Sequence, residues 1–193
     1  MPKIDNEKFY TSAYKQYGKS ARGVNWSSSE TQEIRFKTIL ELLPHSLTHY
    51  TIGDAGSGFG DFYSYMIINE KKPKKYIGID SLKKMCEITE EQTGYTSLHL
   101  DICKDKLPTV DYYICSGALN ILTPFESYLF IQNCYKSSKH GFIFNVLFGD
   151  KESKTYNYMT NYHVEKIAKE LGVKKLVLRD NYLLHDITVG FFK

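Results

Sequence analysis

The chain has 193 residues, 42% of them hydrophobic, and a formal net charge of +3 at pH 7. This length and composition suit one globular domain that buries roughly 70% of the surface of the unfolded chain. Dedicated nucleic-acid binders usually combine a pI above about 9 with a clustered basic face, which this small charge does not indicate. Charge alone leaves a nucleic-acid partner open but gives it little support.

Neither a membrane nor a metal is expected. The start, MPKIDNEKFY, is charged throughout, and the most apolar later stretch, GFIFNVLF, is too short to span a bilayer. We therefore expect a cytoplasmic protein. Its four cysteines show no CxxC pair and no histidine at ligand spacing, so neither a zinc site nor disulfides are predicted.

Two helices are predicted ahead of the first strand, over residues 6–17 and 29–43. Ser29 followed by Gln32 fits a capping box at the start of the second helix. The segment between the helices, YGKSARGVNWSSS, is too rich in glycine and serine for extended regular structure. We expect residues 1–45 to form a helical lid or cap on a core of residues 46–193, all within one domain.

The rest of the chain alternates between strand and helix patterns. Strand patterns cover residues 50–52, 76–79, 97–100, 112–115 and 142–146, and helix patterns cover residues 59–68, 82–92, 124–137 and 162–171. This alternation predicts a parallel sheet with helices on both faces. Two further strands, 174–179 and 186–192, are separated by too few residues for a parallel connection and must therefore be antiparallel.

The glycine-rich stretch GDAGSGFG, residues 53–60, directly follows the first predicted strand. A strand, a glycine turn and a helix together form an arrangement in which backbone N–H groups face a ligand that approaches closely. Asp80 and Asp101 end the second and third strands, so both face the same crevice and suggest a site for a ribose and an adenine. Taken singly, each aspartate could equally be a solvated loop or cap residue.

The spacing of the glycines separates two kinds of cofactor. Dinucleotide sites carry GxGxxG, whereas Asp54, Gly56, Gly58 and Gly60 here form DxGxGxG. A carboxylate at Asp54 would repel a diphosphate and attract a cationic amino-acid group. The spacing therefore favours a cofactor with an amino-acid tail over a nicotinamide dinucleotide.

The motifs GDAGSGFGD, YIGID, LHLDI and DYYICSGALNI, followed by the terminal hairpin, resemble those of class I S-adenosylmethionine-dependent methyltransferases. The resemblance runs from about Tyr50 to the C-terminus. SARGVNWSSSETQEIRF further resembles a group of small bacterial methyltransferases. The signature for adenine modification, Asn or Asp followed by Pro-Pro and an aromatic residue, is absent after Cys115, which argues against a DNA adenine acceptor.

This resemblance implies an α/β fold: a Rossmann-like three-layer sandwich with a seven-stranded, mostly parallel sheet, an antiparallel C-terminal strand and additional N-terminal helices. It implies S-adenosylmethionine as cofactor and methyl transfer as activity. The resemblance assigns the glycine turn to the methionine part of the cofactor and the end of the second strand to the ribose. It assigns the end of the third strand to the adenine and the end of the fourth strand to the sulfonium. The residues are, in that order, Asp54, Gly56, Gly58 and Gly60; Asp80 and Ser81; Asp101 and Ile102; and Ser116 and Gly117.

Residues ahead of the core are further candidates for cofactor binding. Trp26, the single tryptophan, would either stack on cofactor or substrate as part of a lid or plug the N-terminal helix. Lys19, Gln32 or Arg35 could meet the methionine carboxylate, and Arg35 is preferred because a guanidinium grips a carboxylate with two hydrogen bonds. A solvated helix face is the alternative for these three.

The segment FGDKESKTYNYMTNYH leaves the fifth strand at the expected ligand edge. Tyr156, Tyr158, Tyr162 and His163 are therefore candidates for the acceptor pocket, although aromatic residues of a loop can equally pack on the domain. A small-molecule acceptor is favoured over a macromolecule, and no catalytic base is assigned. Two alternatives are a nicotinamide-dependent oxidoreductase and a noncatalytic domain that binds the cofactor or scaffolds a partner.

Overall fold

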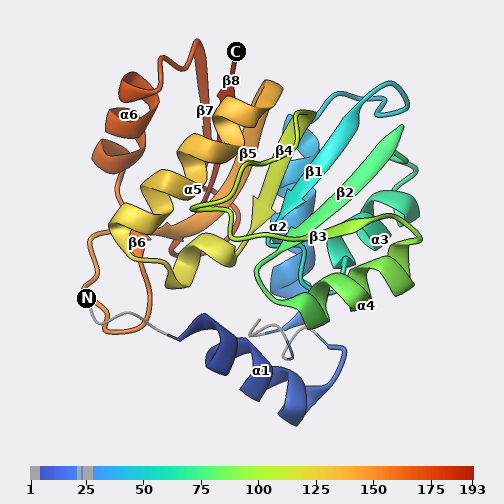
Figure 1. The fold of residues 1–193 in the computed structure, drawn as a ribbon. Helices are drawn as coiled ribbons and strands as arrows, with labels where there is room; N and C mark the ends of the chain where they lie inside the picture. The colour runs from blue at the N-terminus through green and yellow to red at the C-terminus, as the bar shows by residue number, and fades with distance from the viewer. Residues whose placement is uncertain (1–4, 21–22, 24–27) are drawn as a thin grey trace.

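The computed structural model describes residues 5–20, 23 and 28–193 (Figure 1). Within these ranges, none of the helices combines the length and the apolar character that a membrane span requires. The helices are α1 (Asn6–Tyr17), α2 (Ser29–Leu42), α3 (Asp61–Ile68), α4 (Lys83–Thr93), the 3-10 helix η2 (Ala118–Ile121), α5 (Pro124–Ser137) and α6 (Asn161–Glu170). The strands are β1 (Thr51–Ala55), β2 (Lys75–Asp80), β3 (Ser97–His99), β4 (Val110–Ser116), β5 (Ser138–Phe148), β6 (Tyr158–Met159), β7 (Lys175–Arg179) and β8 (Asp186–Phe192).

Seven strands form one sheet in the order β3-β2-β1-β4-β5-β8-β7. The pairs among β1 to β5 are parallel, whereas β8 runs antiparallel to both β5 and β7. The predicted α/β fold with an antiparallel C-terminal strand is therefore confirmed. The additional β6 pairs with the end of β5 and was not predicted, because two residues are too few to show a strand pattern.

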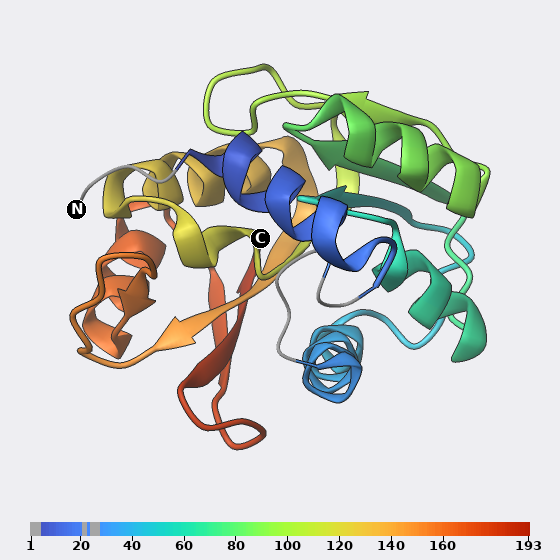
Figure 2. The ribbon, with the colours of Figure 1, turned by 90° about the horizontal axis from the view of Figure 1, so that it is seen from below.

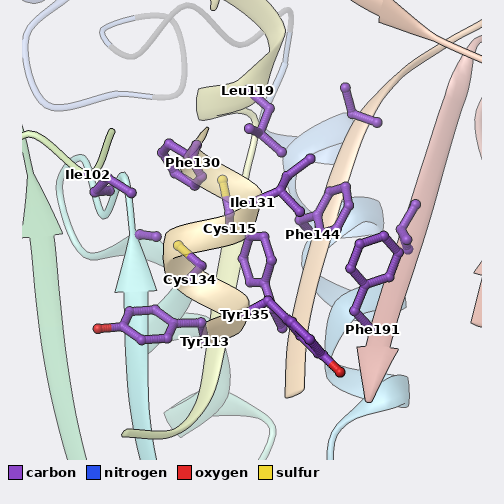
Figure 3. Packing of buried hydrophobic residues seen from close by; sticks show 14 of the residues in the cluster. Ile102, Tyr113, Cys115, Leu119, Phe130, Ile131, Cys134, Tyr135, Phe144 and Phe191 are labelled. Atoms are coloured by element: carbon purple, nitrogen blue, oxygen red, sulfur yellow. The ribbon is translucent and has the colours of Figure 1, made fainter. Parts of the chain in front are cut away.

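Helices cover both faces of the sheet. On one face, Phe36 and Ile39 of α2 pack with Phe62 and Met66 of α3 against the strands. The helix α4 lies on the same face, since Gly78 of β2 faces its residue Thr89. On the other face, α5 and α6 pack against the strands, and Figure 3 shows Cys134 and Tyr135 of α5 among core residues of β4, β5 and β8.

The helix α1 stands apart from these two layers. Figure 2 shows it lying across the edge of the sheet rather than on either face. It is attached through Tyr10 and Tyr14, which pack against a small cluster of Phe59, Met85 and Ile88. The rings of Tyr14 and Phe59 lie 5.7 Å apart between centroids.

The start of α2 differs from its prediction. Its N-cap is Ser28, whose Oγ accepts a hydrogen bond from Thr31 N at 3.2 Å. Gln32 does not reach back to the cap but donates to Asp61 Oδ2 at 3.2 Å. The predicted Ser29–Gln32 capping box is therefore wrong, because three successive serines left the cap position ambiguous and Gln32 found a partner on α3.

Candidate functional site

A cavity of about 400 Å³ opens where the parallel strands end. Ligands of open α/β sheets bind at this edge, and small-molecule sites typically measure roughly 300 to 1,000 Å³. Asp54, Asp80, Asp101 and Ser116, from four strand ends or the loops directly after them, line the cavity together. The topology thus brings together residues that lie as much as 62 positions apart in the chain.

The glycine turn forms one wall of the cavity. Gly56, Gly58 and Gly60 have φ angles of +79°, +56° and +82°, which favour glycine over residues with a side chain. A Cβ atom at Gly56 would lie 2.6 Å from Cβ of Ala118 at the start of η2. Glycine is therefore required at position 56 both for the backbone conformation and for the close approach of the loop after β4.

The amides of this turn are already engaged within the protein. Gly56 N and Ser57 N donate to Ile79 O at 2.7 and 3.1 Å, Gly58 N donates to Asp80 Oδ2 at 3.0 Å, and Gly60 N donates to Ser57 O at 2.8 Å. The expectation that backbone N–H groups of the turn face the ligand is wrong for these four amides. A diphosphate would find none of these donors free.

Asp54 is a buried acid in the cavity wall, with 3% of its surface exposed. Tyr76 Oη donates to Asp54 Oδ2 at 2.6 Å. Burial raises the pKa of Asp54 to about 7, although the hydrogen bond from Tyr76 lowers it. Near neutral pH this group can therefore ionise when a cation arrives, because a neighbouring positive charge favours the carboxylate.

Asp80 ends β2 and is held by two backbone amides. Gly58 N donates to Oδ2 at 3.0 Å and Leu82 N donates to Oδ1 at 2.9 Å. Burial raises the pKa of Asp80 to about 6, while these hydrogen bonds lower it. Each carboxylate oxygen keeps a further lone pair, so the group can still accept hydrogen bonds from a pair of hydroxyls. Ser81, the next residue, also lines the cavity.

The predicted adenine and sulfonium positions lie in the same wall. Asp101 Oδ1 accepts from Cys103 N at 3.0 Å, and Ile102 beside it is buried. Ser116 and Gly117 follow at the end of β4, where Gly117 has a φ of +86°. All four residues line the cavity.

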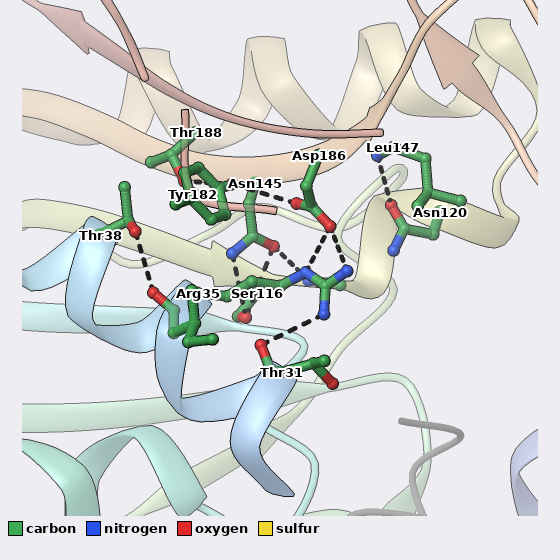
Figure 4. A network of polar contacts seen from close by, with 12 residues as sticks. Thr31, Arg35, Thr38, Ser116, Asn120, Asn145, Leu147, Tyr182, Asp186 and Thr188 are labelled. Carbon is green, nitrogen blue, oxygen red and sulfur yellow. Dashed lines mark hydrogen bonds and ion pairs between the residues drawn. The ribbon is translucent and has the colours of Figure 1, made fainter. Parts of the chain in front are cut away.

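Asn145 of β5 supports this wall from behind. Its side chain is fully buried, and its Oδ1 accepts a hydrogen bond from Gly117 N at 3.0 Å (Figure 4). Its Nδ2 lies 3.3 Å from Ser116 Oγ. This role could not be predicted from the sequence, because an asparagine inside an apolar strand carries no motif.

Of the cationic and polar candidates for the methionine carboxylate, only Gln32 lines the cavity. Arg35 pairs with the buried Asp186 of β8, with its Nε 2.6 Å from Oδ2 (Figure 4). Lys19 pairs with Glu91 of α4 at 2.6 Å. The expected contact of Arg35 with a ligand carboxylate is therefore not supported, because Asp186 already holds its guanidinium. Trp26 lies outside the described residues.

Of the acceptor candidates, only Tyr156 lines the cavity. Tyr158 belongs to β6, and Tyr162 on α6 is 69% exposed. His163 caps its own helix, since its Nδ1 accepts from Thr160 N at 3.2 Å. Among the lining residues that sequence reasoning missed are Phe9 and Tyr10 of α1, because nothing in the sequence fixes where that helix lies.

The described lining carries more negative than positive charge. Its acidic side chains are Asp54, Asp61, Asp80, Asp101 and Glu126. Its one cationic side chain is Lys104. Lys104 is itself paired with Asp101 at 2.5 Å. Across the described residues no group of three or more His, Cys, Asp or Glu is arranged to hold a metal ion. The cavity therefore suits a cationic ligand.

Neither protein-family models nor curated proteins match the chain. Solved structures do match. Magnesium protoporphyrin IX methyltransferase from Synechocystis PCC 6803 with bound SAH is 13% identical, with a TM-score of 0.71 over 97% of both chains. Human N-acetylserotonin methyltransferase in complex with SAM is 14% identical, with a TM-score of 0.70 over 98% of this chain and 60% of that one. A SAM-dependent methyltransferase from Leishmania major is 18% identical, with a TM-score of 0.68 over 98% of this chain and 85% of that one. The chain has the class I methyltransferase fold.

Proposed function

We propose that the protein is an S-adenosylmethionine-dependent methyltransferase that acts on a small molecule. The observation that carries this proposal is the acid-lined cavity behind a glycine turn, in which Asp54 and Asp80 stand at adjacent strand ends. The turn offers few free amides to a diphosphate, and the buried Asp54 suits the ammonium group of an amino-acid tail. The shared fold and the bound SAH or SAM in two of the similar structures support the same cofactor.

We assign each part of the cofactor to a group that lines the cavity. Asp54 would receive the ammonium group of the methionine part, and both oxygens of Asp80 would accept from the ribose hydroxyls. Asp101 and Ile102 would frame the adenine. Ser116 and Gly117, held by Asn145, would lie beside the sulfonium.

The sulfonium of the bound cofactor makes its methyl group electrophilic. The protein then has to align the acceptor with that methyl group and exclude water from the site. The helix α1 covers the cavity edge and contributes Phe9 and Tyr10 to the lining, which serves this exclusion (Figure 2). No histidine is present in the described lining, so we assign no catalytic base.

A small-molecule acceptor fits the electrostatics better than a nucleic acid. The basic run at 71–75 leads into the N-terminal end of β2, so it lies at the opposite edge of the sheet from the cavity. Lys71 in this run donates to His45 O at 2.5 Å, which fastens it to the domain surface. The carboxylates of the cavity would repel phosphates. The names of two of the similar structures, which mention a porphyrin and N-acetylserotonin, support the same choice.

Thermal unfolding in the presence of S-adenosylmethionine, S-adenosylhomocysteine or NAD tests the proposal. A ligand at 100 times its dissociation constant stabilises the native state by about 2.7 kcal/mol. We expect the first two compounds to raise the melting temperature and NAD to leave it unchanged. Stabilisation by NAD alone would replace this proposal with an oxidoreductase. Stabilisation by the first two, without methyl transfer to any compound of a broad acceptor panel, would favour a noncatalytic role.

A further inference from the structure

A second part of the cavity lies beyond the acids that suit the cofactor. Its wall is built largely from aromatic side chains, and we call it the aromatic wall: Phe9, Tyr10, Ile121, Phe125 and Tyr156. None of these side chains carries a charge at neutral pH. The wall is the feature of the cavity that the cofactor assignment leaves unused.

The order of the strands separates the two parts. In the sequence β3-β2-β1-β4-β5, the cofactor acids stand at the ends of β3, β2 and β1 or just after them. Ile121 and Phe125 follow β4, and Tyr156 follows β5. Asn157 N donates to Asn120 O at 2.7 Å and Leu147 N to Asn120 Oδ1 at 3.0 Å, so Asn120 fastens these segments together. Ile121, Phe125 and Tyr156 therefore lie on the β4–β5 side, after the strand ends that include Ser116 and Gly117, whereas Phe9 and Tyr10 reach the cavity from α1.

Tyr10 connects the two parts of the cavity. It reaches the lining from α1, which crosses the strand ends in Figure 2. Burial and the nearby carboxylate of Asp80 raise the pKa of Tyr10, so its hydroxyl stays protonated as a hydrogen-bond donor. Among the contacts of the described residues, this hydroxyl has no hydrogen-bond partner, and Tyr10 is one of the residues that line the cavity. An acceptor molecule with an exposed oxygen or nitrogen would provide one.

The charge of the lining restricts what can enter. An anionic acceptor would meet five carboxylates and a single lysine that is already paired. Flat aromatic molecules pack well against aromatic side chains, because paired rings attract each other beyond the effect of the buried area. Phe125 is 69% exposed and Tyr156 is 39% exposed, so both stand at the mouth where such a molecule would enter.

We propose that the methyl acceptor is a small, uncharged aromatic molecule, held by the aromatic wall and hydrogen-bonded to the hydroxyl of Tyr10. This inference rests on the proposed function, because it takes the other part of the cavity as the cofactor site. Phe9 and Tyr10 would cover the ring from α1, while Phe125 and Tyr156 would border it on the opposite side. Tyr10 would act as a binding and positioning residue.

Three matched probes test this class of acceptor molecule. Their binding is measured by calorimetry on the protein saturated with S-adenosylhomocysteine. The probes are 1-naphthol, its anionic counterpart 1-naphthoate and its saturated counterpart decahydro-1-naphthol. We expect 1-naphthol to bind and the other two to bind at least about tenfold more weakly, from charge repulsion and lost ring contacts respectively. Equal or tighter binding of 1-naphthoate would overturn the proposal.

Variants of the lining residues test where 1-naphthol binds. Tyr10→Phe should weaken 1-naphthol about fivefold through the lost hydrogen bond, and Phe125→Ala about tenfold through lost ring contact. Phe125 is mostly exposed, so its truncation leaves the core intact. Tyr162→Ala, a change of the same kind on the exposed face of α6, should have no effect. Unchanged binding in both Tyr10→Phe and Phe125→Ala would contradict the proposed site.

The failure of this inference is distinguishable from failure of the proposed function. If S-adenosylhomocysteine binds but 1-naphthol does not, the aromatic acceptor is wrong and the cofactor site stands. If S-adenosylhomocysteine itself does not bind, the proposed function falls and the inference with it.

Discussion

The carboxyl group of Asp54, which we propose receives the cofactor's ammonium group, is buried beside the phenol of Tyr76. In the free protein, burial keeps the pKa of Asp54 at about 7 and that of Asp80 at about 6. Both values exceed those of ordinary carboxyl groups, near 4. The folded state therefore binds protons more tightly than the unfolded state, and this contribution to stability is lost as the pH rises from about 4 to 7.

Cofactor affinity should show the opposite dependence on pH. The ammonium group favours the ionised Asp54, so the dissociation constant of S-adenosylhomocysteine should rise as the pH falls from 8 to 5.5 and both acids take up protons. Tyr76→Phe removes a hydrogen bond that lowers the pKa of Asp54, so it should move this transition to higher pH. Calorimetry at several pH values measures both effects. A dissociation constant that does not vary with pH would rule out the assigned role of Asp54.

Gly56 can be compared with a glycine that has a similar φ angle but open space around it. Gly94 has a φ of +70° with no atom within 4 Å of an added Cβ, whereas an added Cβ at Gly56 would meet Ala118. Gly94→Ala should lower the free energy of unfolding by about 1 to 2 kcal/mol through backbone strain alone. Gly56→Ala should cost about 1 to 3 kcal/mol more through the steric clash, and it should weaken S-adenosylhomocysteine. Equal losses of stability in urea denaturation would contradict the close approach.

Some site residues can be read from the sequence and others cannot. Asp54, Asp80 and the glycines follow strand patterns directly, so local spacing places them at one edge of the sheet. The partners Tyr76 and Asn145 lie within apolar strands, and their contacts depend on strand register and side-chain direction. Arg35 illustrates the same limit, since its partner Asp186 is 151 positions away.

At the scale of elements, the ion pair between Arg35 and Asp186 joins α2 to the antiparallel strand β8 (Figure 4). Tyr182 Oη adds a hydrogen bond to Asp186 Oδ1 at 3.1 Å. Burial raises the pKa of Asp186, while Arg35 and Tyr182 lower it. The pair therefore fixes the position of α2 against the sheet, next to the wall of the cavity.

Breaking this pair from one side should be costly. Arg35→Leu leaves Asp186 buried without its counter-charge and should lower the free energy of unfolding by about 3 to 5 kcal/mol. The double variant Arg35→Leu with Asp186→Leu should recover much of that loss, because no lone charge remains buried. Lys37→Leu, on an exposed face of the same helix, should change stability by less than about 0.5 kcal/mol. Urea denaturation measures all three, and a harmless Arg35→Leu would show that the pair is not structural.

Most elements were predictable because each strand is a short apolar run set apart by a longer helical pattern. The close hairpin of β7 and β8 fixed their antiparallel direction. The elements that were missed, η2 and β6, have only four and two residues and carry no periodicity. Their position matters for function, because both border the loop that carries Tyr156.

At the scale of the whole molecule, α1 is a helix that packs across the strand ends and over the cavity (Figure 2). We predict that S-adenosylhomocysteine slows hydrogen exchange of the amides in α1, because Phe9 and Tyr10 would gain a contact surface. Exchange in the glycine turn should slow as well, and α6, which does not border the cavity, should be unaffected. Hydrogen exchange followed by mass spectrometry resolves these segments. Protection of the turn without protection of α1 would contradict a covering role for this helix.

The sequence established the edge of the sheet at which the site lies, but not how far the cavity extends. The strand order and the glycine turn follow from local patterns, whereas the placement of α1 depends on packing of Tyr10 and Tyr14 against α4 and Phe59. Such packing joins residues more than 40 positions apart and leaves no periodic trace. Of the proposed acceptor part of the cavity, the sequence suggested Tyr156, whereas the contribution of α1 could be recognised only from the structure.

The most direct test of the account is the dissociation constant of S-adenosylhomocysteine for the wild-type protein and for Asp80→Ala, measured by calorimetry at one pH. The wild type should bind, and Asp80→Ala should lose roughly 1 to 3 kcal/mol, or about five- to 150-fold in affinity, through hydrogen bonds to a charged group. Glu170→Gln, an exposed acid at the end of α6, is the control and should bind as the wild type does. Equal affinity of Asp80→Ala and the wild type would contradict the placement of the ribose and, with it, the proposed cofactor site.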